Sequence, residues 1–352
     1  MNKGRVPQYG AIDFAKFMCA LLIVVSHYIS ENATGRINSL FDYASSLYII
    51  VVPFFFVCSG FFLFKKLFDS NDNHREIIVA YCRRNFVLYI GWSTIYVLFK
   101  ILTWIRFGTT KQEVLQYLLN SLFYSTYQTI WFLPALCVGV IITYFLYKKM
   151  GIKRTMLVAM FLYFIGALGV SYGFLLEGTF VEDIVSIYNS IFVSTRNGFF
   201  NGFPFVTIGA LIAKERTEKR NVILKRDLIF TCLLGCAFIA EAFVLKFLFN
   251  AVNANTLIFL IPFSYFFVRF CLNIPLKSGS ILLWMRKMST TIFLCQRLYL
   301  SAIPLLFPNG LCARLLIGNP YIGCVFVITI TMLTAWGIIV LSNKSKIFKF
   351  LC

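Results

Sequence analysis

The sequence predicts an all-α fold, a polytopic membrane helical bundle of about ten transmembrane helices with both termini in the cytoplasm. Three observations predict this class. Of the 352 residues, 59% are hydrophobic. Only 13% are charged, whereas a soluble domain carries about 25%. The basic residues lie in short clusters between apolar runs, which indicates membrane loops and argues against a nucleic-acid partner despite the net charge of +19.

Ten apolar runs approach the ~20 residues needed to cross a bilayer. They cover residues 11–30, 45–64, 85–104, 130–147, 155–175, 198–213, 228–248, 255–273, 288–308 and 321–342. The sixth run is short and holds Gly202, Pro204 and Gly209, so we expect a kinked or partly re-entrant segment. Asp13 and Lys16 interrupt the first run, and we expect it to remain as a signal anchor rather than to be cleaved.

No stretch between these runs is long enough for a separate soluble domain. The longest are residues 105–129 and 176–197 on one side, and 65–84 and 214–227 on the other. The sequence therefore predicts one integral-membrane domain over residues 1–352, in the plasma or inner membrane and in contact with the lipid bilayer.

The basic residues predict the orientation of the runs. One alternate set of segments holds 23 of them: Lys3, Arg5, Lys65, Lys66, Arg75, Arg83, Arg84, Lys148, Lys149, Lys153, Arg154, Lys214, Arg216, Lys219, Arg220, Lys225, Arg226, Lys277, Arg286, Lys287, Lys344, Lys346 and Lys349. The opposite loops hold five: Arg36, Arg106, Lys111, Arg196 and Arg314. Cytoplasmic loops are enriched in lysine and arginine, so the first set and both termini are expected inside the cell.

Eleven cysteines are scattered along the chain, mostly inside apolar runs. None forms a Cys-x-x-Cys pair or a Cys/His cluster with metal-ligand spacing. We interpret them as small apolar residues and expect no metal site and no disulfide framework.

Three polar residues share one face of the first run. At about 100° per residue, Lys16 and His27 return to within roughly 20° of each other, and Asp13 lies about 40° from His27. A charged group inside a bilayer costs on the order of 3 kcal/mol. The stripe therefore suggests a lined interior rather than a lipid-facing surface.

Each member of the stripe also has a simpler interpretation. His27 would form an ordinary hydrogen bond near the outer end of the helix, and Asp13 with Lys16 an interfacial ion pair. Glu31, one turn after His27, could orient the imidazole, although a solvated loop position is favoured for it. The functional interpretation is a cation at the cytoplasmic mouth of a cavity that ends at His27.

Two further groups have equally open interpretations. Arg83 and Arg84, with Lys65 and Lys66 across the same loop, are explained by the orientation rule, but arginine is also the usual phosphate clamp. Glu241 is the only acid deep in the seventh run, which makes it either a functional carboxylate or the partner of Arg269 or Arg297. Trp131 is either an interfacial aromatic residue or a stacking platform for a sugar.

Five motifs follow one another along the chain. They are Ile12-Asp13 with Lys16 and His27, then Pro53-Phe54-Phe55 with Ser59-Gly60, then Arg83-Arg84 between Tyr81 and Tyr89, then Trp131-Phe132-Leu133, and last the run from Met288 to Gln296. Together they resemble the membrane acyltransferase-3 family, whose members O-acylate sugars and cell-surface polymers. The resemblance covers the whole chain. It departs from the family pattern at Lys16, where arginine is usual, and at Gln296, where a late histidine is common.

The resemblance implies transfer of an acyl group from a cytoplasmic acyl-CoA, with acetyl-CoA as the expected donor, to a hydroxyl of a surface polysaccharide or lipid-linked saccharide. His27 would be the general base. Lys16, Arg83 and Arg84 would hold the CoA phosphates or shape the entry of the donor, with Asp13 fixing Lys16. Lys65 would also contact the donor, and Ser59 stays open as an acyl carrier. Trp131 and Glu241 would contact the acceptor. No permanently bound cofactor is expected.

Two other classes fit the polar stripe. One is a transporter or flippase for a small amino acid or a lipid-linked sugar, with the stripe lining the substrate path. The other is a sensor or anchoring module without activity.

Overall fold

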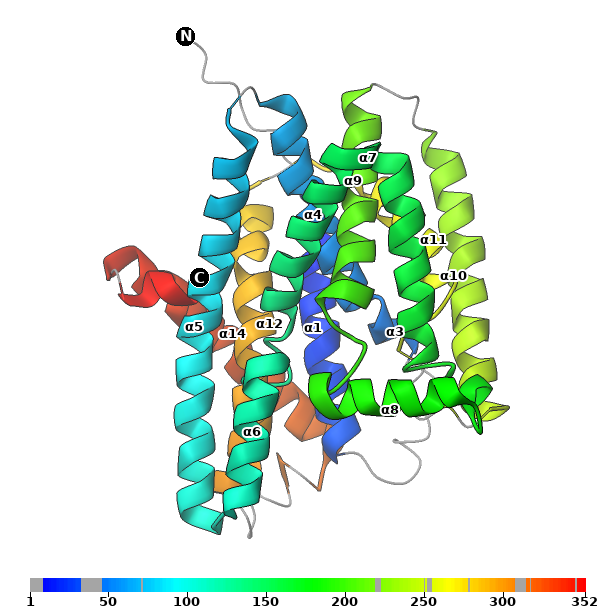
Figure 1. Cartoon of the computed structure of the whole chain (residues 1–352). Helices are drawn as coiled ribbons and strands as arrows, with labels where there is room; N and C mark the ends of the chain where they lie inside the picture. Colours follow the sequence, from blue (N-terminus) through cyan, green and yellow to red (C-terminus); the bar gives the residue numbers. More distant parts are fainter. Residues whose placement is uncertain are drawn as a thin grey trace. The chain divides into compact units, whose positions relative to one another are not determined.

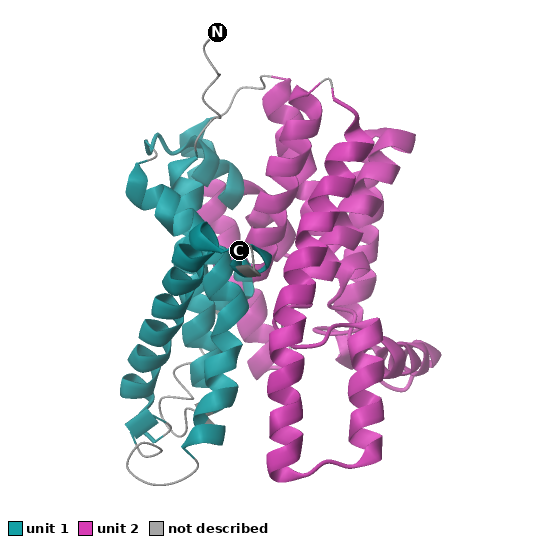
Figure 2. Cartoon of the chain, turned by 90° about the vertical axis from the view of Figure 1, so that its left-hand side faces the viewer, with its two compact units in different colours: residues 1–51, 222–228, 267–352 teal, residues 52–221, 229–266 magenta. Residues whose placement is uncertain are grey.

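The computed structural model describes residues 9–32, 46–70, 72–218, 223–249, 251, 255–277, 279–307, 315–316, 318–345 and 347–352. Throughout these residues the chain forms helices joined by turns, without a strand (Figure 1). The all-α class is therefore confirmed. The chain divides into two compact units, residues 1–51, 222–228 and 267–352, and residues 52–221 and 229–266 (Figure 2). The single domain expected over residues 1–352 stays a prediction.

Unit 1 is built around the first helix and two late ones. Its elements are α1 (Gly10–Asn32), α3 (Ser46–Ile49), α12 (Ser280–Leu306), α14 (Pro320–Lys344) and η3 (Ile347–Leu351), with the first turn of α10 and the end of α11. α1 packs against both α12 and α14. Phe17 of α1 and Trp284 of α12 place their ring centroids 5.7 Å apart. This packing brings together segments separated by more than 250 residues of sequence.

Unit 2 holds most of the other helices. They are α4 (Val51–Asp69), α5 (His74–Phe107), α6 (Lys111–Phe123), α7 (Phe132–Leu168), η1 (Gly173–Leu176), α8 (Phe180–Phe192), η2 (Gly198–Gly202), α9 (Phe203–Thr217), most of α10 (Leu224–Phe247) and the start of α11 (Leu260–Asn273). Residues 203–210 of α9 are all buried. The unit therefore has its core around α9.

The long helix α7 is a hairpin of two arms. Gly151 interrupts it with φ 77° and ψ 166°, a left-handed conformation that glycine adopts without steric cost. The segment 195–202 contacts both ends of α7, because Gly198 lies against Ala135 and Val138, while Thr195 donates to the carbonyl of Gly166 at 2.8 Å. The chain therefore reverses at Gly151 (Figure 1). The sequence predicted two spans here, 130–147 and 155–175, and the arms correspond to them.

Helices α4 and α9 touch through their backbones. A Cβ on Gly209 would lie 2.5 Å from the amide nitrogen of Phe61 and 2.9 Å from the carbonyl carbon of Gly60. Small residues permit such close helix packing inside membranes. The Ser59-Gly60 motif therefore has a structural role whatever its chemistry.

Six helices of the described residues are long and apolar enough to cross a membrane: Gly10–Glu31, Leu47–Asp69, His74–Phe107, Phe132–Leu168, Leu224–Phe247 and Pro320–Lys344. The expected count of about ten is not confirmed. Two expected spans merge into α7. Two others, α9 and α11, have only 15 and 14 residues. The ninth run is α12, which carries three basic residues and is not among the six.

The sixth run shows the expected irregularity. It begins as the π-helical turn η2 and continues as α9, with Pro204 at the start of the helix. Proline fits there because the first turn of a helix needs no backbone N–H.

Two of the stretches expected as loops contain helices. α6 forms a hairpin with α5, in which Trp104 meets Tyr117 edge-on with ring centroids 5.2 Å apart. α5 has 34 residues and a length of ~51 Å, so it extends beyond a hydrocarbon core of ~30 Å. α8 runs across the direction of α9 (Figure 1).

The orientation across the membrane stays a prediction. Some of the basic residues that support it lie outside the described residues, namely Lys3, Arg5, Arg36, Lys219, Arg220, Arg314 and Lys346.

Candidate functional site

In unit 1 the polar stripe of α1 faces α12. Asp13 is 2% exposed and accepts two hydrogen bonds from Arg286, at 2.8 Å from Nε and 2.7 Å from Nη2. This is the bidentate geometry that arginine and carboxylate groups favour. Asp13 also lies in the first turn of α1, where a negative charge complements the helix dipole. The pair therefore fixes the start of α1 against α12.

His27 lies almost four turns further along α1 and contacts the same partner helix. Its Nδ1 is 3.3 Å from Oε1 of Gln296. Gln296 has no exposed surface, whereas His27 is half-buried. One edge of the imidazole is thus held inside unit 1.

The amide of Gln296 sets the tautomer of His27. Its Nε2 donates to the carbonyl of Phe293 at 3.3 Å, which turns Oε1 toward the imidazole. An amide oxygen only accepts hydrogen bonds, so Nδ1 of His27 carries the proton. In the neutral ring Nε2 is then the basic nitrogen.

Glu31 and Arg297 form a third link between α1 and α12. Glu31 belongs to the last turn of α1 rather than to a loop, and it makes an ion pair with Nη1 of Arg297. The Arg297 side chain is 13% exposed, and that of Glu31 is 38% exposed. The loop position favoured for Glu31 is therefore wrong, although its carboxylate keeps contact with solvent.

Lys16 is half-buried on α1, between Asp13 and His27. Asp13 has Arg286 as a bidentate partner, which the sequence did not indicate. The roles expected of Lys16 and Asp13 toward the donor stay predictions.

The expected donor-binding residues lie in unit 2. Arg83 and Arg84 are exposed on α5, and Lys65 makes an i,i+4 ion pair with Asp69 at 2.6 Å. Ser59 is half-buried beside Tyr81. The two arginines reach solvent, whereas Lys65 already neutralises a carboxylate.

Trp131 precedes α7 and is only 6% exposed. It stacks on Tyr124 with ring centroids 5.9 Å apart and planes 13° from parallel. The guanidinium carbon of Arg196 lies 5.6 Å from the centre of its ring. Burial raises the pKa of Tyr124 to about 12, so its hydroxyl stays neutral. Trp131 is therefore buried between Tyr124 and Arg196, and both interpretations of it, an interfacial aromatic residue and a stacking platform for a sugar, stay predictions.

Glu241 binds the start of another helix. Its carboxylate accepts hydrogen bonds from the backbone nitrogens of Ile258 at 2.5 Å and Phe259 at 2.9 Å, and from the hydroxyl of Tyr172. Residues 258 and 259 lead directly into α11. These contacts cap a helix N-terminus, which gives Glu241 a structural role within unit 2.

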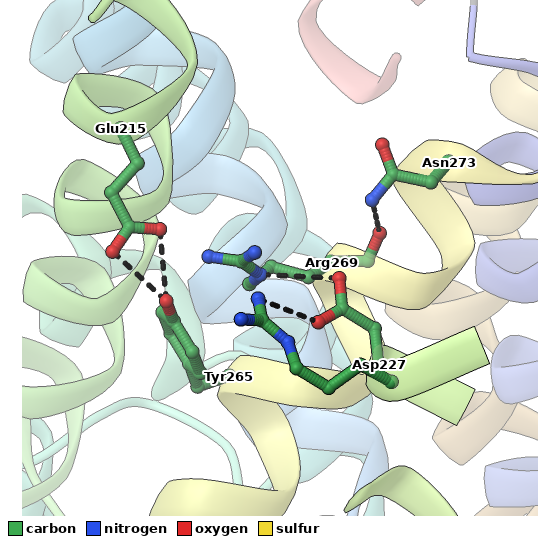
Figure 3. A network of polar contacts seen from close by, with 6 residues as sticks. Glu215, Asp227, Tyr265, Arg269 and Asn273 are labelled. Carbon is green, nitrogen blue, oxygen red and sulfur yellow. Dashed lines mark hydrogen bonds and ion pairs between the residues drawn. The ribbon is translucent and has the colours of Figure 1, made fainter. Parts of the chain in front are cut away.

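The two arginines considered as partners of Glu241 pair with other acids. Arg297 pairs with Glu31, as described above. In unit 1, Nε of Arg269 lies 3.3 Å from the fully buried carboxylate of Asp227, and Arg226 approaches the same carboxylate at 3.5 Å (Figure 3). In unit 2, Tyr265 donates to Glu215 at 2.8 Å (Figure 3).

Comparison with known proteins identifies the family. The family model for the acyltransferase domain matches residues 9–341, nearly the whole chain. The chain belongs to the acyltransferase-3 family. Membership supports a membrane acyltransferase, and the six apolar helices indicate a multi-pass membrane protein.

The acyltransferase-3 chain is also similar to part of several longer proteins. An amino-acid racemase of Enterococcus faecalis is 31% identical over 225 residues, 61% of this chain and 30% of that protein. A serine/alanine racemase of Enterococcus gallinarum is 24% identical over 260 residues, 73% of this chain and 36% of that protein. The chain thus spans about a third of the length of these relatives. No solved structure matches it.

Two residues that contact the stripe of α1, Arg286 and Gln296, are not singled out by the sequence as its partners. In the sequence, Arg286 is explained as an ordinary cytoplasmic charge, and Gln296 stands out only as a departure from the family pattern. The available signal for Gln296 was a lone amide inside an apolar run. Such a buried polar group needs a hydrogen-bond partner, but the sequence did not show that the partner is His27.

Proposed function

We propose that the chain is a membrane O-acyltransferase that moves an acetyl group from cytoplasmic acetyl-CoA to a hydroxyl of a surface polysaccharide or lipid-linked saccharide. The contact between His27 and Gln296 is the observation that carries this proposal. It gives the imidazole a fixed tautomer with Nε2 as its base. A general base must first be correctly positioned toward the proton that it removes, and only then does its pKa affect the rate.

In the proposed reaction, Nε2 of His27 takes the proton of the acceptor hydroxyl. The oxygen attacks the thioester carbonyl carbon, a C–O bond forms, and the C–S bond breaks. The thiolate of CoA leaves and takes the proton back from the imidazolium. No covalent acyl-enzyme is required, so Ser59 is not part of this route.

The ion pairs on either side of His27 support this role. Asp13–Arg286 and Glu31–Arg297 both join α1 to α12, the helix that carries Gln296. They hold the two helices in one register, which keeps the hydrogen bond between Nδ1 and Oε1 formed. Preorganised groups of this kind avoid reorganisation during the reaction.

A second candidate is passage of a small amino acid through the membrane. The names of the relatives favour it, because two are called amino-acid racemase and one serine/alanine racemase. In this alternative the domain would deliver or export an amino acid, and the stripe on α1 would line its path.

One paired experiment separates the two candidates. Membrane vesicles with and without the chain are given acetyl-CoA labelled in the acetyl group, and in parallel labelled serine or alanine. Label in a glycan or lipid-linked saccharide that requires the chain supports acyl transfer. Amino-acid uptake that requires the chain, with no acetylated product, supports transport and contradicts acyl transfer.

A further inference from the structure

An aromatic cavity of about 290 Å³ lies within unit 2. The last residues of α6, the start of α7, the inner face of α8 and the turn η2 surround it. Most lining groups are aromatic or aliphatic, including Phe123, Trp131, Pro134, Leu162 and Phe192. The volume is at the small end of ligand pockets, ~300 Å³, and the lining is suited to hydrocarbon.

Among the polar lining residues, which include Tyr124 and Tyr188, Asn197 is already hydrogen-bonded within the protein. Its Nδ2 donates to the hydroxyl of Tyr188 at 2.6 Å and to the carbonyl of Ser194 at 3.2 Å. Its Oδ1 accepts from the backbone nitrogens of Phe199 and Phe200. This side chain caps η2, so it does not offer the hydrogen bonds that a sugar ring would require.

Arg196, which makes no ion pair with the described residues, lies beside the cavity. Arg196 directly precedes Asn197 and stacks over Trp131, and both of those residues line the cavity. Within the described part of the chain, Nε of Arg196 is buried and has no hydrogen-bond partner. A buried donor of this kind indicates a missing partner, and guanidinium groups match the geometry of phosphate.

The exposed surface of α8 would bring the cavity into contact with membrane lipid. Phe180, Ile184, Ile187 and Ile191 form an exposed apolar stripe, with Phe180 76% and Ile187 62% exposed. The helix has 13 residues, too few to cross a bilayer, for which ~20 are needed. A short helix with an apolar stripe lies in the plane of the interface, with that stripe among the lipid chains. Its other face carries Phe192 into the cavity.

We propose that this cavity binds the hydrocarbon chain of a phosphate-headed lipid, with the guanidinium of Arg196 against the phosphate. This inference rests on the proposed function, because it concerns the acceptor of the acyl group. It favours a lipid-linked saccharide over a free polysaccharide as the acceptor.

The test uses the full chain purified in a maltoside detergent, which contains no phosphate. Farnesyl phosphate, farnesol and inorganic phosphate are titrated separately, with binding followed by tryptophan fluorescence. We expect saturable binding of farnesyl phosphate. Farnesol should bind at least about tenfold more weakly, because it lacks the hydrogen bond between the phosphate and a charged group. Inorganic phosphate alone should not bind in the same range.

Variants locate the site. Arg196→Gln should reduce the affinity for farnesyl phosphate to that for farnesol and leave farnesol binding unchanged. Leu162→Trp, which fills the cavity, should weaken both. Arg106→Gln is the matched control, because Arg106 is also an arginine of the expected outer loops placed over an aromatic ring, Phe107, but does not line the cavity. It should change neither affinity.

The proposal is overturned by any of these results: no saturable binding of farnesyl phosphate, equal affinities for farnesyl phosphate and farnesol, or unchanged affinities in Arg196→Gln. Tight binding of inorganic phosphate alone would also overturn it, because the site would then recognise the ion and not a lipid. Acetyl transfer in vesicles reports on the proposed function separately. Acetyl transfer without binding of farnesyl phosphate would contradict only this inference. Binding of farnesyl phosphate without acetyl transfer would contradict only the proposed function.

Discussion

Asp13 and Arg286 form a bidentate ion pair although 273 residues separate them in the sequence. The carboxylate is 2% exposed, and the guanidinium side chain is 43% exposed. Loss of Arg286 therefore leaves a buried charge unpaired, whereas loss of Asp13 leaves a charge that reaches solvent.

Replacing Arg286 with alanine should destabilise the protein more than replacing Asp13. Arg286→Ala leaves a buried carboxylate without its donors, which costs about 3–5 kcal/mol. Asp13→Ala leaves an arginine that reaches solvent. Thermal unfolding in detergent, followed by circular dichroism, measures both. In the double variant the loss should be smaller than the sum of the single losses, and an additive result would show that the pair is not coupled.

The sequence indicates this region because polar side chains on an apolar membrane helix are energetically unfavourable. It does not identify the partners of these side chains. Periodicity places Asp13 and His27 on one face of α1, because helical geometry is local. Arg286 and Gln296 face them only through the packing of α12, which no local pattern encodes. The same limit explains Glu31, whose partner Arg297 lies on α12.

Some elements could be predicted because their signals are local. Gly151 separates two apolar runs and marks the reversal of α7. By contrast, α6 and α8 are short amphipathic helices in stretches interpreted as loops, since neither is long enough to register as a span.

Gln296 should determine the rate of acetyl transfer by fixing the tautomer of His27. Gln296→Leu removes the acceptor for Nδ1–H, and we expect kcat to fall about 10–100-fold, the loss seen when a group that orients a metal-bound histidine is removed. KM should stay near the wild-type value. Gln296→Glu keeps an acceptor at the same place and should retain most of the rate. Steady-state kinetics in vesicles would measure kcat and KM for both variants. An equal fall in kcat in both variants would indicate that Gln296 has a packing role instead.

The ion pair between Glu31 and Arg297 should show the opposite dependence on which partner is lost. Glu31→Gln leaves a mostly buried guanidinium without its acid, at a cost of about 1–3 kcal/mol. Arg297→Gln leaves a more exposed carboxylate, which water can solvate, so it should cost less. Comparison of the two unfolding midpoints checks this order. A larger loss in Arg297→Gln would mean that the arginine has a further partner.

Stability at the start of α6 should depend on pH through Glu113. This carboxylate accepts hydrogen bonds from the backbone nitrogen of Thr110 and the hydroxyl of Thr109, which hold its pKa below the usual 4.5. A lowered folded-state pKa stabilises the helix start above the unfolded value, and this stabilisation is lost as the pH falls through the folded pKa. Hydrogen exchange of the first α6 amides should therefore show weaker protection in acid.

Glu113→Gln is the matched control for this effect. Its amide oxygen still accepts from Thr110, so the capping box remains, but it does not titrate. Protection in this variant should be independent of pH after correction for the intrinsic exchange rate. The same acid-induced loss in both proteins would assign the effect to another group.

The most direct measurement of the central claim is the rate of acetyl transfer from labelled acetyl-CoA in vesicles that contain His27→Ala. The chain supplies its own control, because His74 is its other histidine and begins α5 in unit 2. If His27 is the general base, His27→Ala should lower kcat at least ~10²-fold, and His74→Ala should leave it unchanged. Acetyl transfer by His27→Ala at the wild-type rate would contradict the account.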